Sequence, residues 1–484
     1  MERSVVATSS AQVGYRRDLR LRERLSPAAA PAVLLVVAAA WAAARGIDHR
    51  FISFSDGVYL YAASQAAAHG LNELYGTIAL SLPPGTPVLA TLLWKLSPHI
   101  ETVRVAVAVM SSLTAFLTYR AARSLFGLRR ETATLAAVLA LAGPVHAQFV
   151  GVEGETFLTP LALGLALALN SERDPMAVVL LGLGLVFKLT WAPFFLAGVL
   201  LVGVRAGWRR ALGVGLAGSL LSGLVYVAMA RSFGWSAREL LAQLLLAESH
   251  SGWQLGLAAG ISLAVLVMWW PGLVLAPAGL RGTSRSARYV MAAALVSSVS
   301  MVKQGTFFNV LDPLEPFLAM AAVAGGCALW RGSAGRRALV VFCTAGAVVH
   351  AVGVSGIPGS RAIPLSLSAA IVDTQNEGTV NRIARAIDAH SRPDEPVLVS
   401  PFFALVADRH EPLGATDWFI LRALERSCAG RPGGSRHCGD WQDAKAAKSA
   451  VVSVDSNVVS FDPSFRRSTG SPTMRRLIKV DAPP

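Results

Sequence analysis

Long apolar runs alternate along the chain with short clusters of arginine. The runs are rich in Leu, Ala, Val and Gly and occupy most of residues 27–355. A helix needs about 20 apolar residues to cross the hydrocarbon core of a bilayer, and most of these runs approach that length. The pattern therefore predicts a mainly α, polytopic helical membrane protein with about eleven transmembrane helices.

The arginine clusters predict how these helices are oriented. When the chain is traced across the predicted spans, five basic clusters fall on one side: residues 16–24, 120–130, 205–210, 281–288 and 331–337. Basic loops stay in the cytoplasm, so we expect the N-terminus to be cytoplasmic and residues 46–100 to lie outside an inner (plasma) membrane. An odd number of spans then places the C-terminal region outside.

Two stretches of the membrane pattern leave alternatives open. The apolar runs on either side of Lys188 are short, and they fit either two full spans or a re-entrant pair. The first run, Ala28–Ala44, is followed by Arg45 and fits either an uncleaved helix or a cleaved signal peptide. We favour the uncleaved helix, because cleavage would release the following segment from its membrane tether.

Changes in composition divide the chain into three parts. Residues 1–26 are polar and basic and form a cytoplasmic N-terminus. Residues 27–355 form the transmembrane domain, in which residues 46–100 are an extracytoplasmic loop with juxtamembrane helices. Residues 356–484 have a mixed composition and form a soluble extracytoplasmic domain.

The soluble part carries short secondary-structure patterns. Thr379–His390 has the periodicity of an amphipathic helix, and Pro396–Ser400 and Ala450–Val454 have that of short buried strands. About 130 residues suffice for a small domain, so we expect a C-terminal α/β domain.

Charge and cysteine content exclude two classes of protein. The net charge is +14, but only 15% of the residues are charged and 53% are hydrophobic, whereas soluble domains are about 25% charged. The arginines lie between apolar runs, so they do not indicate a nucleic-acid partner. Four cysteines are too few for a disulfide scaffold, although Cys428 and Cys438 lie in the predicted outer domain, where we expect a disulfide.

Ionisable residues gather at the predicted outer ends of the spans. An ionisable residue in or beside a membrane span is costly and is a functional candidate by default. The candidates here are Asp56, Glu73, Lys95, Glu101, Arg104, Glu153, Glu155, Lys188, Lys303, Asp312 and Glu315. A transporter places such groups near the bilayer centre, whereas these spans are nearly free of charge.

The loop after the first apolar run contains Asp56 among aromatic and small residues. A carboxylate held just outside a bilayer is suited to chemistry on a lipid-linked substrate, although an ordinary loop with a solvated aspartate fits the same pattern. Two further features exclude other mechanisms. The nine histidines show no metal-ligand spacing, and the absence of a phosphate-binding loop motif argues against an ATP-driven pump.

A lipid-phosphate sugar donor requires two kinds of group from its enzyme. The phosphate leaving group needs cationic donors, and the candidates are Arg104, Lys188 and Lys303. The acceptor hydroxyl needs a carboxylate base, and the candidates are Asp56 and Glu153. A second acid is also suited to hold a sugar hydroxyl or a divalent cation such as Mg²⁺ or Mn²⁺.

Each of these residues also has a structural interpretation. Arg104 is placed to extend its charge from a helix end to water, and Lys303 to mark the end of a span. Glu153 and Glu155 fit a solvated turn, in which Glu155 complements the dipole of the next helix. Tyr59 fits the belt of aromatic residues at a membrane surface.

The order of several short motifs resembles a known family. The motifs, in chain order, are Ser55-Asp56-Gly57 with Tyr59, Leu74-Tyr75, Leu82-Pro-Pro-Gly85, Arg104, Tyr119–Gly127, Val186-Phe-Lys188-Leu-Thr190, Lys303-Gln-Gly-Thr-Phe-Phe-Asn309 and Glu395–Ser400. The chain resembles the membrane glycosyltransferases of the C superfamily (GT-C), close to the bacterial dolichyl-phosphate-mannose-protein mannosyltransferase-like branch. The resemblance extends over most of the chain and rests on order and spacing.

The resemblance implies a function and a set of roles. It implies an enzyme that transfers a sugar from a polyprenyl-phosphate donor to an extracytoplasmic acceptor (a cell-envelope glycan, lipid or protein) by an inverting displacement. It implies Asp56 as the catalytic base, with Glu153 as the second acidic position. We further expect Tyr59, Tyr75, Glu155 and Asn309 to bind substrate. A membrane transporter or flippase and a non-catalytic envelope-assembly protein remain the alternatives.

Overall fold

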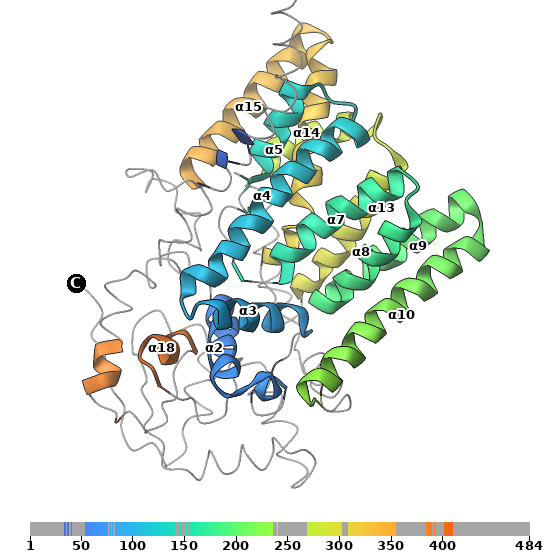
Figure 1. Ribbon diagram of the computed structural model, residues 1–484. Helices are drawn as coiled ribbons and strands as arrows, with labels where there is room; N and C mark the ends of the chain where they lie inside the picture. Colours follow the sequence, from blue (N-terminus) through green and yellow to red (C-terminus); the bar gives the residue numbers. More distant parts are fainter. Residues whose placement is uncertain are drawn as a thin grey trace, which may run out of the picture.

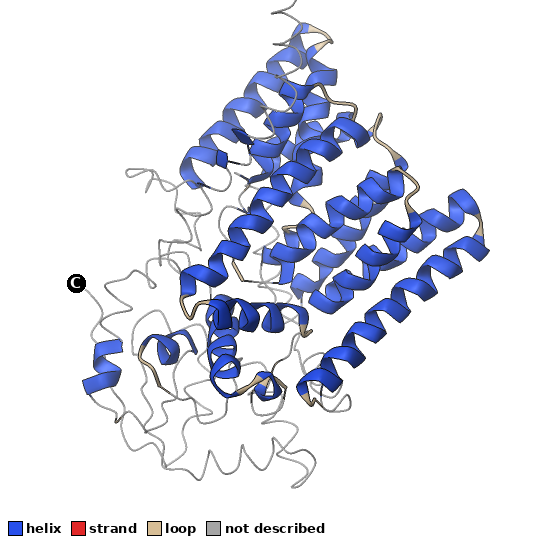
Figure 2. Cartoon of the chain, in the orientation of Figure 1, coloured by secondary structure: helices blue, strands red, loops and turns tan. Residues whose placement is uncertain are grey.

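The structure is a computed structural model, and part of the chain is described in it. The described residues are 33–34, 36–37, 40, 54–75, 78, 80, 83–141, 143, 145–146, 151–152, 154–235, 240, 269–302, 308–354, 384–389, 392 and 401–409, with the side chains of 54–56, 301–302, 308–309, 347–354 and 401–403 excepted. The regular elements in these ranges are helices (Figure 2), and the remaining backbone pairing is one isolated bridge between Leu74 and Ile78.

A slanted bundle of helices forms the main body of the molecule (Figure 1). Its helices are α4 (Ile100–Leu125), α5 (Arg130–Leu141), α7 (Gly154–Asn170), α8 (Asp174–Phe187), α9 (Ala192–Ala206), α10 (Trp208–Phe233), a helix at residues 269–280, α13 (Arg285–Ser298), α14 (Glu315–Trp330) and α15 (Ala334–Val354). Within the described residues, three helical stretches are long and apolar enough to cross a membrane: Ile100–Leu125, Leu189–Ala206 and Trp208–Phe233. The predicted class, a mainly helical polytopic membrane protein, is confirmed, while the count of about eleven spans stays a prediction.

Small residues allow the helices of this bundle to pack closely. A Cβ atom at Gly279 would lie 2.0 Å from the carbonyl oxygen of Ala321, and one at Gly325 would lie 1.9 Å from that of Leu275. Glycine is therefore required on both sides of the contact between α14 and the helix at residues 269–280. Close packing at small residues is the usual way in which helices associate inside a membrane.

The outer surface of the bundle is apolar. On α10, the leucines at 212, 216, 220 and 224 follow one another at intervals of four residues, and each is between 60% and 66% exposed. A row of exposed leucines along a 26-residue helix is the surface that lipid tails cover.

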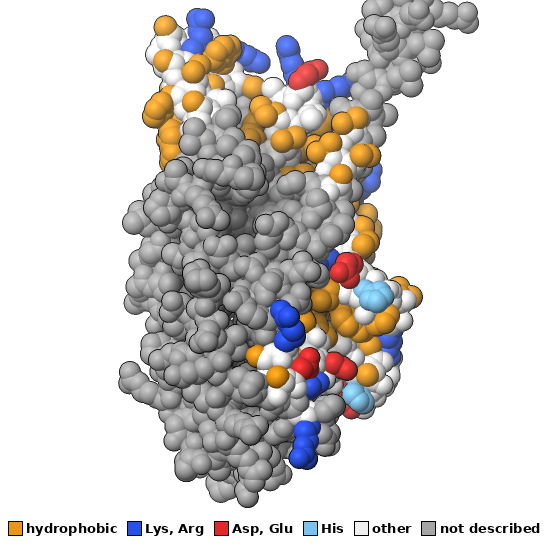
Figure 3. Space-filling view, turned by 90° about the vertical axis from the view of Figure 1, so that its left-hand side faces the viewer, with side chains coloured by type: hydrophobic (Ala, Val, Ile, Leu, Met, Phe, Trp, Pro, Cys, Tyr) orange, Lys and Arg blue, Asp and Glu red, His pale blue; other side chains and the backbone are white. Residues whose placement is uncertain are grey.

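The turns that carry the arginines meet at one end of the bundle. The amide of Ser284, before α13, donates to the carbonyl of Leu125 at the end of α4 (3.0 Å), and Ser286 bonds Asn170 at the end of α7. Arg205 at the end of α9 pairs with Glu172, 2.7 Å away, in the turn before α8. Lys and Arg side chains gather above a hydrophobic band in the upper part of Figure 3. The side of the membrane that this end faces stays a prediction.

Two helices lie at the opposite end, where the sequence predicts juxtamembrane helices. They are α2 (Phe54–His69) and α3 (Gly85–Leu96), and α3 crosses the lower end of the bundle in Figure 1. A Cβ at Gly85 would lie 2.8 Å from the carbonyl oxygen of Val186. Because this oxygen belongs to the backbone and has little freedom to move, only glycine lets α3 begin this close to the last turn of α8.

A segment from the C-terminal region packs against α2. This segment is α18 (Pro401–Val406), and Leu405 joins an apolar cluster formed by α2, α3, α4 and Val152. Arg409 pairs with Asp388 at 2.8 Å, which ties α18 to the helix at residues 384–389. That helix lies within the range predicted as helical. The two predicted strands and the Cys428–Cys438 pair lie outside the described residues, and the domain boundary at residue 356 is not tested.

Candidate functional site

Lys188 lies at the turn between two antiparallel helices. It follows α8 in an extended conformation (φ −159°, ψ 142°), and the short 3-10 helix η3 (Leu189–Trp191) then leads into α9. Arg210 pairs with Asp174 at the far end, where α8 begins and α10 follows α9. The break at Lys188 therefore puts one cation at the end of the bundle opposite the arginine turns.

Glu155 forms an ion pair with Lys188. Glu155 lies in the first turn of α7, and its Oε1 contacts the Nζ of Lys188, with the side chains 2% and 15% exposed. A Cβ at the neighbouring Gly154 would lie 3.0 Å from the Cδ of Lys188, so glycine leaves room for the lysine stem. The structure thus brings together a residue predicted to hold the donor phosphate and one predicted to bind substrate.

A second buried contact begins one turn further along α7. The hydroxyl of Thr159 lies 3.1 Å from the carbonyl oxygen of Glu155 and also contacts Oδ2 of Asp312, so its single proton is shared between two acceptors. The other oxygen of Asp312 accepts a hydrogen bond from Nδ1 of His146 at 2.9 Å. All three side chains in this contact are buried.

Glu315 extends the same set of contacts. Its carboxylate accepts the backbone amides of Val145 at 3.2 Å and His146 at 2.6 Å, and the indole N–H of Trp269 at 2.9 Å. A Cβ at Gly143 would lie 2.2 Å from Cδ of Glu315, so this turn requires glycine. We call the resulting set the buried polar chain: Lys188, Glu155, Thr159, Asp312, His146 and Glu315.

The sequence indicated part of this chain and missed the rest. Asp312 and Glu315 were grouped with the ionisable rim residues but received no role. His146 and Thr159 were missed, because a lone histidine without ligand spacing and a threonine in an apolar helix carry no signal of their own. The signals that point to them are the Gly143–Pro144 break before His146 and two acids spaced three residues apart before an apolar helix.

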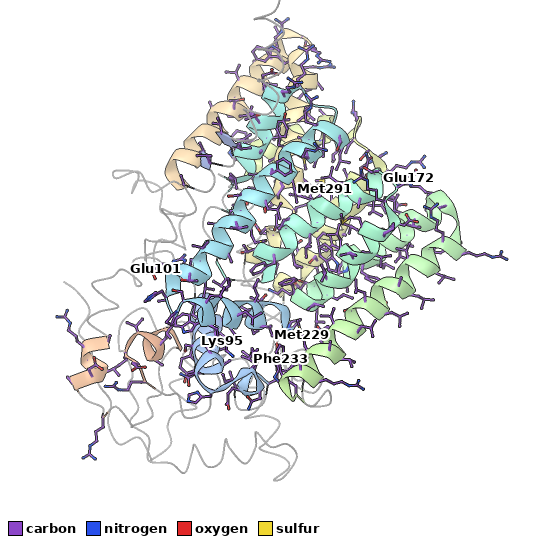
Figure 4. All side chains as sticks on the ribbon, in the orientation of Figure 1. Lys95, Glu101, Glu172, Met229, Phe233 and Met291 are labelled. Atoms are coloured by element: carbon purple, nitrogen blue, oxygen red, sulfur yellow. The ribbon has the colours of Figure 1, made fainter. Side chains whose placement is uncertain are left out.

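The remaining phosphate-binding candidates are placed differently. Arg104 lies on the buried face of α4 with 4% of its surface exposed, so its side chain faces the protein interior. Lys303 lies outside the described residues, as does Glu153. Two other ionisable candidates, Lys95 and Glu101, were given no role in phosphate binding, and both are exposed. Figure 4 shows both near α3, far from Glu172 at the arginine end.

The other predicted site residues lie near the same end or outside the described part. The backbone of Asp56 is in the first turn of α2, and that of Asn309 is in the 3-10 helix η5 (Phe308–Leu311), but neither side chain is described. Tyr59 is 2% exposed and packs in the cluster that Leu405 joins. Their roles stay predictions.

Tyr75 has an unusual backbone conformation. Its φ is 61°, in the left-handed region that few non-glycine residues adopt. The ring packs edge-on against Trp235, with centroids 5.0 Å apart, and its burial raises the pKa of the phenol well above its usual value. Such strain is retained where the surrounding structure holds the residue in place. Here the contact between Tyr75 and Trp235 holds the loop between α2 and α3 against the end of α10.

The described residues offer no preformed metal site. No three His, Cys, Asp or Glu side chains in the described ranges are grouped as metal ligands. Both carboxylates at the start of α14 are occupied by hydrogen bonds. A divalent cation therefore remains a prediction that rests on residues outside the described part.

Comparison with known proteins identifies the fold. No family model and no curated protein match the chain. The similar solved structures include ArnT from Cupriavidus metallidurans bound to undecaprenyl phosphate and the same protein in the apo state. Each is 15% identical, with a TM-score of 0.58, and the match covers 82% of this chain and 88% of ArnT. The chain therefore has the fold of these ArnT structures.

Proposed function

We propose that this protein is a membrane glycosyltransferase that transfers a sugar from a polyprenyl-phosphate donor to an extracytoplasmic acceptor. The observation that carries the proposal is the similarity over 82% of the chain to ArnT, one structure of which holds undecaprenyl phosphate. At 15% identity this similarity concerns the fold, so the chemistry is argued from the residues of this chain.

We assign the groups that the reaction requires to the end of the bundle where α2 and α3 lie. Lys188 follows α8, and α3 begins against Val186 of that helix. The helix that begins near Asp56, α2, packs on α3. We expect a lipid phosphate that reaches Lys188 from the membrane to present its sugar on the side where α2 packs on α3.

The proposed reaction is an inverting displacement at the anomeric carbon. The acceptor hydroxyl forms a new bond to this carbon while the bond to the phosphate oxygen breaks, and polyprenyl phosphate leaves with the bonding electron pair. Asp56 takes the proton of the acceptor hydroxyl as general base. Lys188 stabilises the charge on the departing phosphate, and Glu155 orients the lysine until the donor binds.

The carboxylate of Asp56 is the group to test first. We expect the change Asp56→Asn to lower transfer about a hundredfold or more, because it removes the base and leaves the shape of the side chain. Transfer is measured from a radiolabelled polyprenyl-phosphate sugar in proteoliposomes. The control is Asp48→Asn, the same change in the same predicted loop.

One result would reject the proposed base, and another would reject the proposed activity. Undiminished transfer by the Asp56→Asn variant would remove Asp56 from the mechanism. Accumulation of the sugar inside the vesicles without a new glycosidic bond would favour a transporter.

The acceptor is identified by comparing the glycans and glycolipids of cells with and without the gene, since the envelope component that disappears contains the acceptor.

A further inference from the structure

The start of α14 is tied to two segments that lie more than 150 positions away in the sequence. Asp312 binds His146 and Thr159, and Glu315 binds the backbone amides of Val145 and His146. The two acids are 5% and 3% exposed. One short stretch of chain thus holds both the turn after α5 and the second turn of α7.

The hydrogen bonds show what these acids do. Each carboxylate oxygen of Asp312 and of Glu315 accepts at least one hydrogen bond, and Oε1 of Glu315 accepts two. A carboxylate whose oxygens are all engaged by fixed donors is poorly suited to act as a base or a metal ligand. It is well suited to hold its donors in place.

The contacts then lead from α14 to the lysine. Thr159 lies one helical turn after Glu155, on the same face of α7, and its hydroxyl contacts both Asp312 and the carbonyl of Glu155. Glu155 in turn pairs with Lys188. These contacts form a continuous path from Asp312 to Lys188 through one turn of α7.

We infer that Asp312 and Glu315, acting through Thr159 and His146, are positioning residues that set the place of the Glu155–Lys188 pair and thereby the affinity for the donor phosphate. The identity of that ligand rests on the proposed function, whereas the mechanical coupling does not. A buried polar network adds little net stability compared with an apolar core of the same shape, which favours a role in positioning.

The first test removes one hydroxyl. Thr159→Val keeps the shape of the side chain and breaks the contact between Asp312 and α7. We expect the KM for the polyprenyl-phosphate donor to rise about tenfold, since a charge-assisted hydrogen bond is lost. We also expect kcat at saturating donor to stay within about threefold, and the KM for the acceptor to be unchanged.

A matched control comes from another buried threonine. Thr118 on α4 donates to the carbonyl of Thr114 four residues earlier, at 2.7 Å, and this bond stays within one helix. Thr118→Val should leave the donor KM unchanged. A donor KM that stays within twofold in Thr159→Val, or that rises equally in Thr118→Val, would overturn the inference.

The histidine allows a rescue experiment. His146→Leu removes the donor to Asp312, whereas the amide nitrogen of His146→Asn takes the place of Nδ1. We expect the donor KM to rise in the leucine variant and to return toward the wild-type value in the asparagine variant. Equal defects in two variants that fold equally well would contradict a positioning role.

A last measurement does not depend on sugar transfer. Acetylation of the Lys188 amine by an N-hydroxysuccinimide ester, followed by mass spectrometry, reports how firmly Glu155 holds it. We expect the reaction at Lys188 to become several times faster in Thr159→Val and to stay unchanged in Thr118→Val. If the wild-type protein transfers no sugar and this change is still seen, the coupling stands and the proposed function fails. If sugar is transferred and Lys188 reacts at the same rate in both variants, the coupling fails and the function stands.

Discussion

Lys188 and Glu155 show how far single residues are predictable from sequence. Each attracts attention because it is an ionisable residue beside an apolar run. Their pairing follows only from the packing of α7 beside α8, which places positions 33 apart in the sequence next to each other. The same holds for Thr159 and Asp312, whose contact depends on three helices that pack together in the bundle.

Variants of Lys188 and Glu155 allow the effect of this ion pair on stability to be measured separately from its effect on sugar transfer. Lys188→Met removes the cation that pairs with the buried Glu155 carboxylate, and breaking a buried ion pair on one side is expected to cost about 3–5 kcal/mol of unfolding free energy. The double change Lys188→Met with Glu155→Leu removes both charges, so we expect thermal stability to return toward the wild-type value while sugar transfer stays lost. The measurements are the melting temperature in detergent and the transfer assay. Transfer restored along with stability would show that the lysine has no role in the reaction.

At the scale of elements, the pattern of apolar runs predicted the helices well and their ends less well. The apolar run that follows Arg129 and Arg130 continues beyond Leu141, but α5 ends at that residue. The reason is the Gly143–Pro144 pair, because proline disfavours a helical residue before it and lacks an amide to continue the helix. The break matters, because it turns His146 toward Asp312 and so creates part of the buried polar chain.

The contact between α3 and α8 carries the element-scale prediction. Gly85→Ala would place a methyl group 2.8 Å from the backbone oxygen of Val186, which has little freedom to move. We expect α3 to shift away from Lys188, with transfer lowered at least tenfold and the melting temperature lowered by several degrees.

The control for this change is Gly213→Ala on α10. A Cβ there meets nothing within 4 Å, and alanine favours a helix over glycine by about 1 kcal/mol. We therefore expect unchanged transfer and an equal or higher melting temperature in the control. Full activity of the Gly85→Ala variant would mean that the reaction does not depend on where α3 begins.

At the scale of the whole molecule, the two ends of the bundle differ in kind. One end carries short turns with arginines, and the other carries α2, α3 and α18 (Figure 1), together with the Glu155–Lys188 pair. The sequence predicted this division, because arginine clusters and acidic candidates alternate along the chain with the apolar runs. It did not predict that α18 packs against α2, since a short apolar segment carries no information about its partner.

The division makes the orientation in the membrane testable with two matched cysteines. Glu131 lies in the first turn of α5 at the arginine end, Asp408 follows α18 at the other end, and both are exposed. Glu131→Cys and Asp408→Cys are treated in intact cells with a maleimide that does not cross membranes, against the protein without the added cysteine. Because basic turns stay in the cytoplasm, we expect Asp408→Cys to react at once and Glu131→Cys to react only after the membrane is permeabilised. The reverse result would place the buried polar chain in the cytosolic half of the bilayer, where no extracytoplasmic acceptor reaches it, and the proposed function would have to be abandoned while the fold remained.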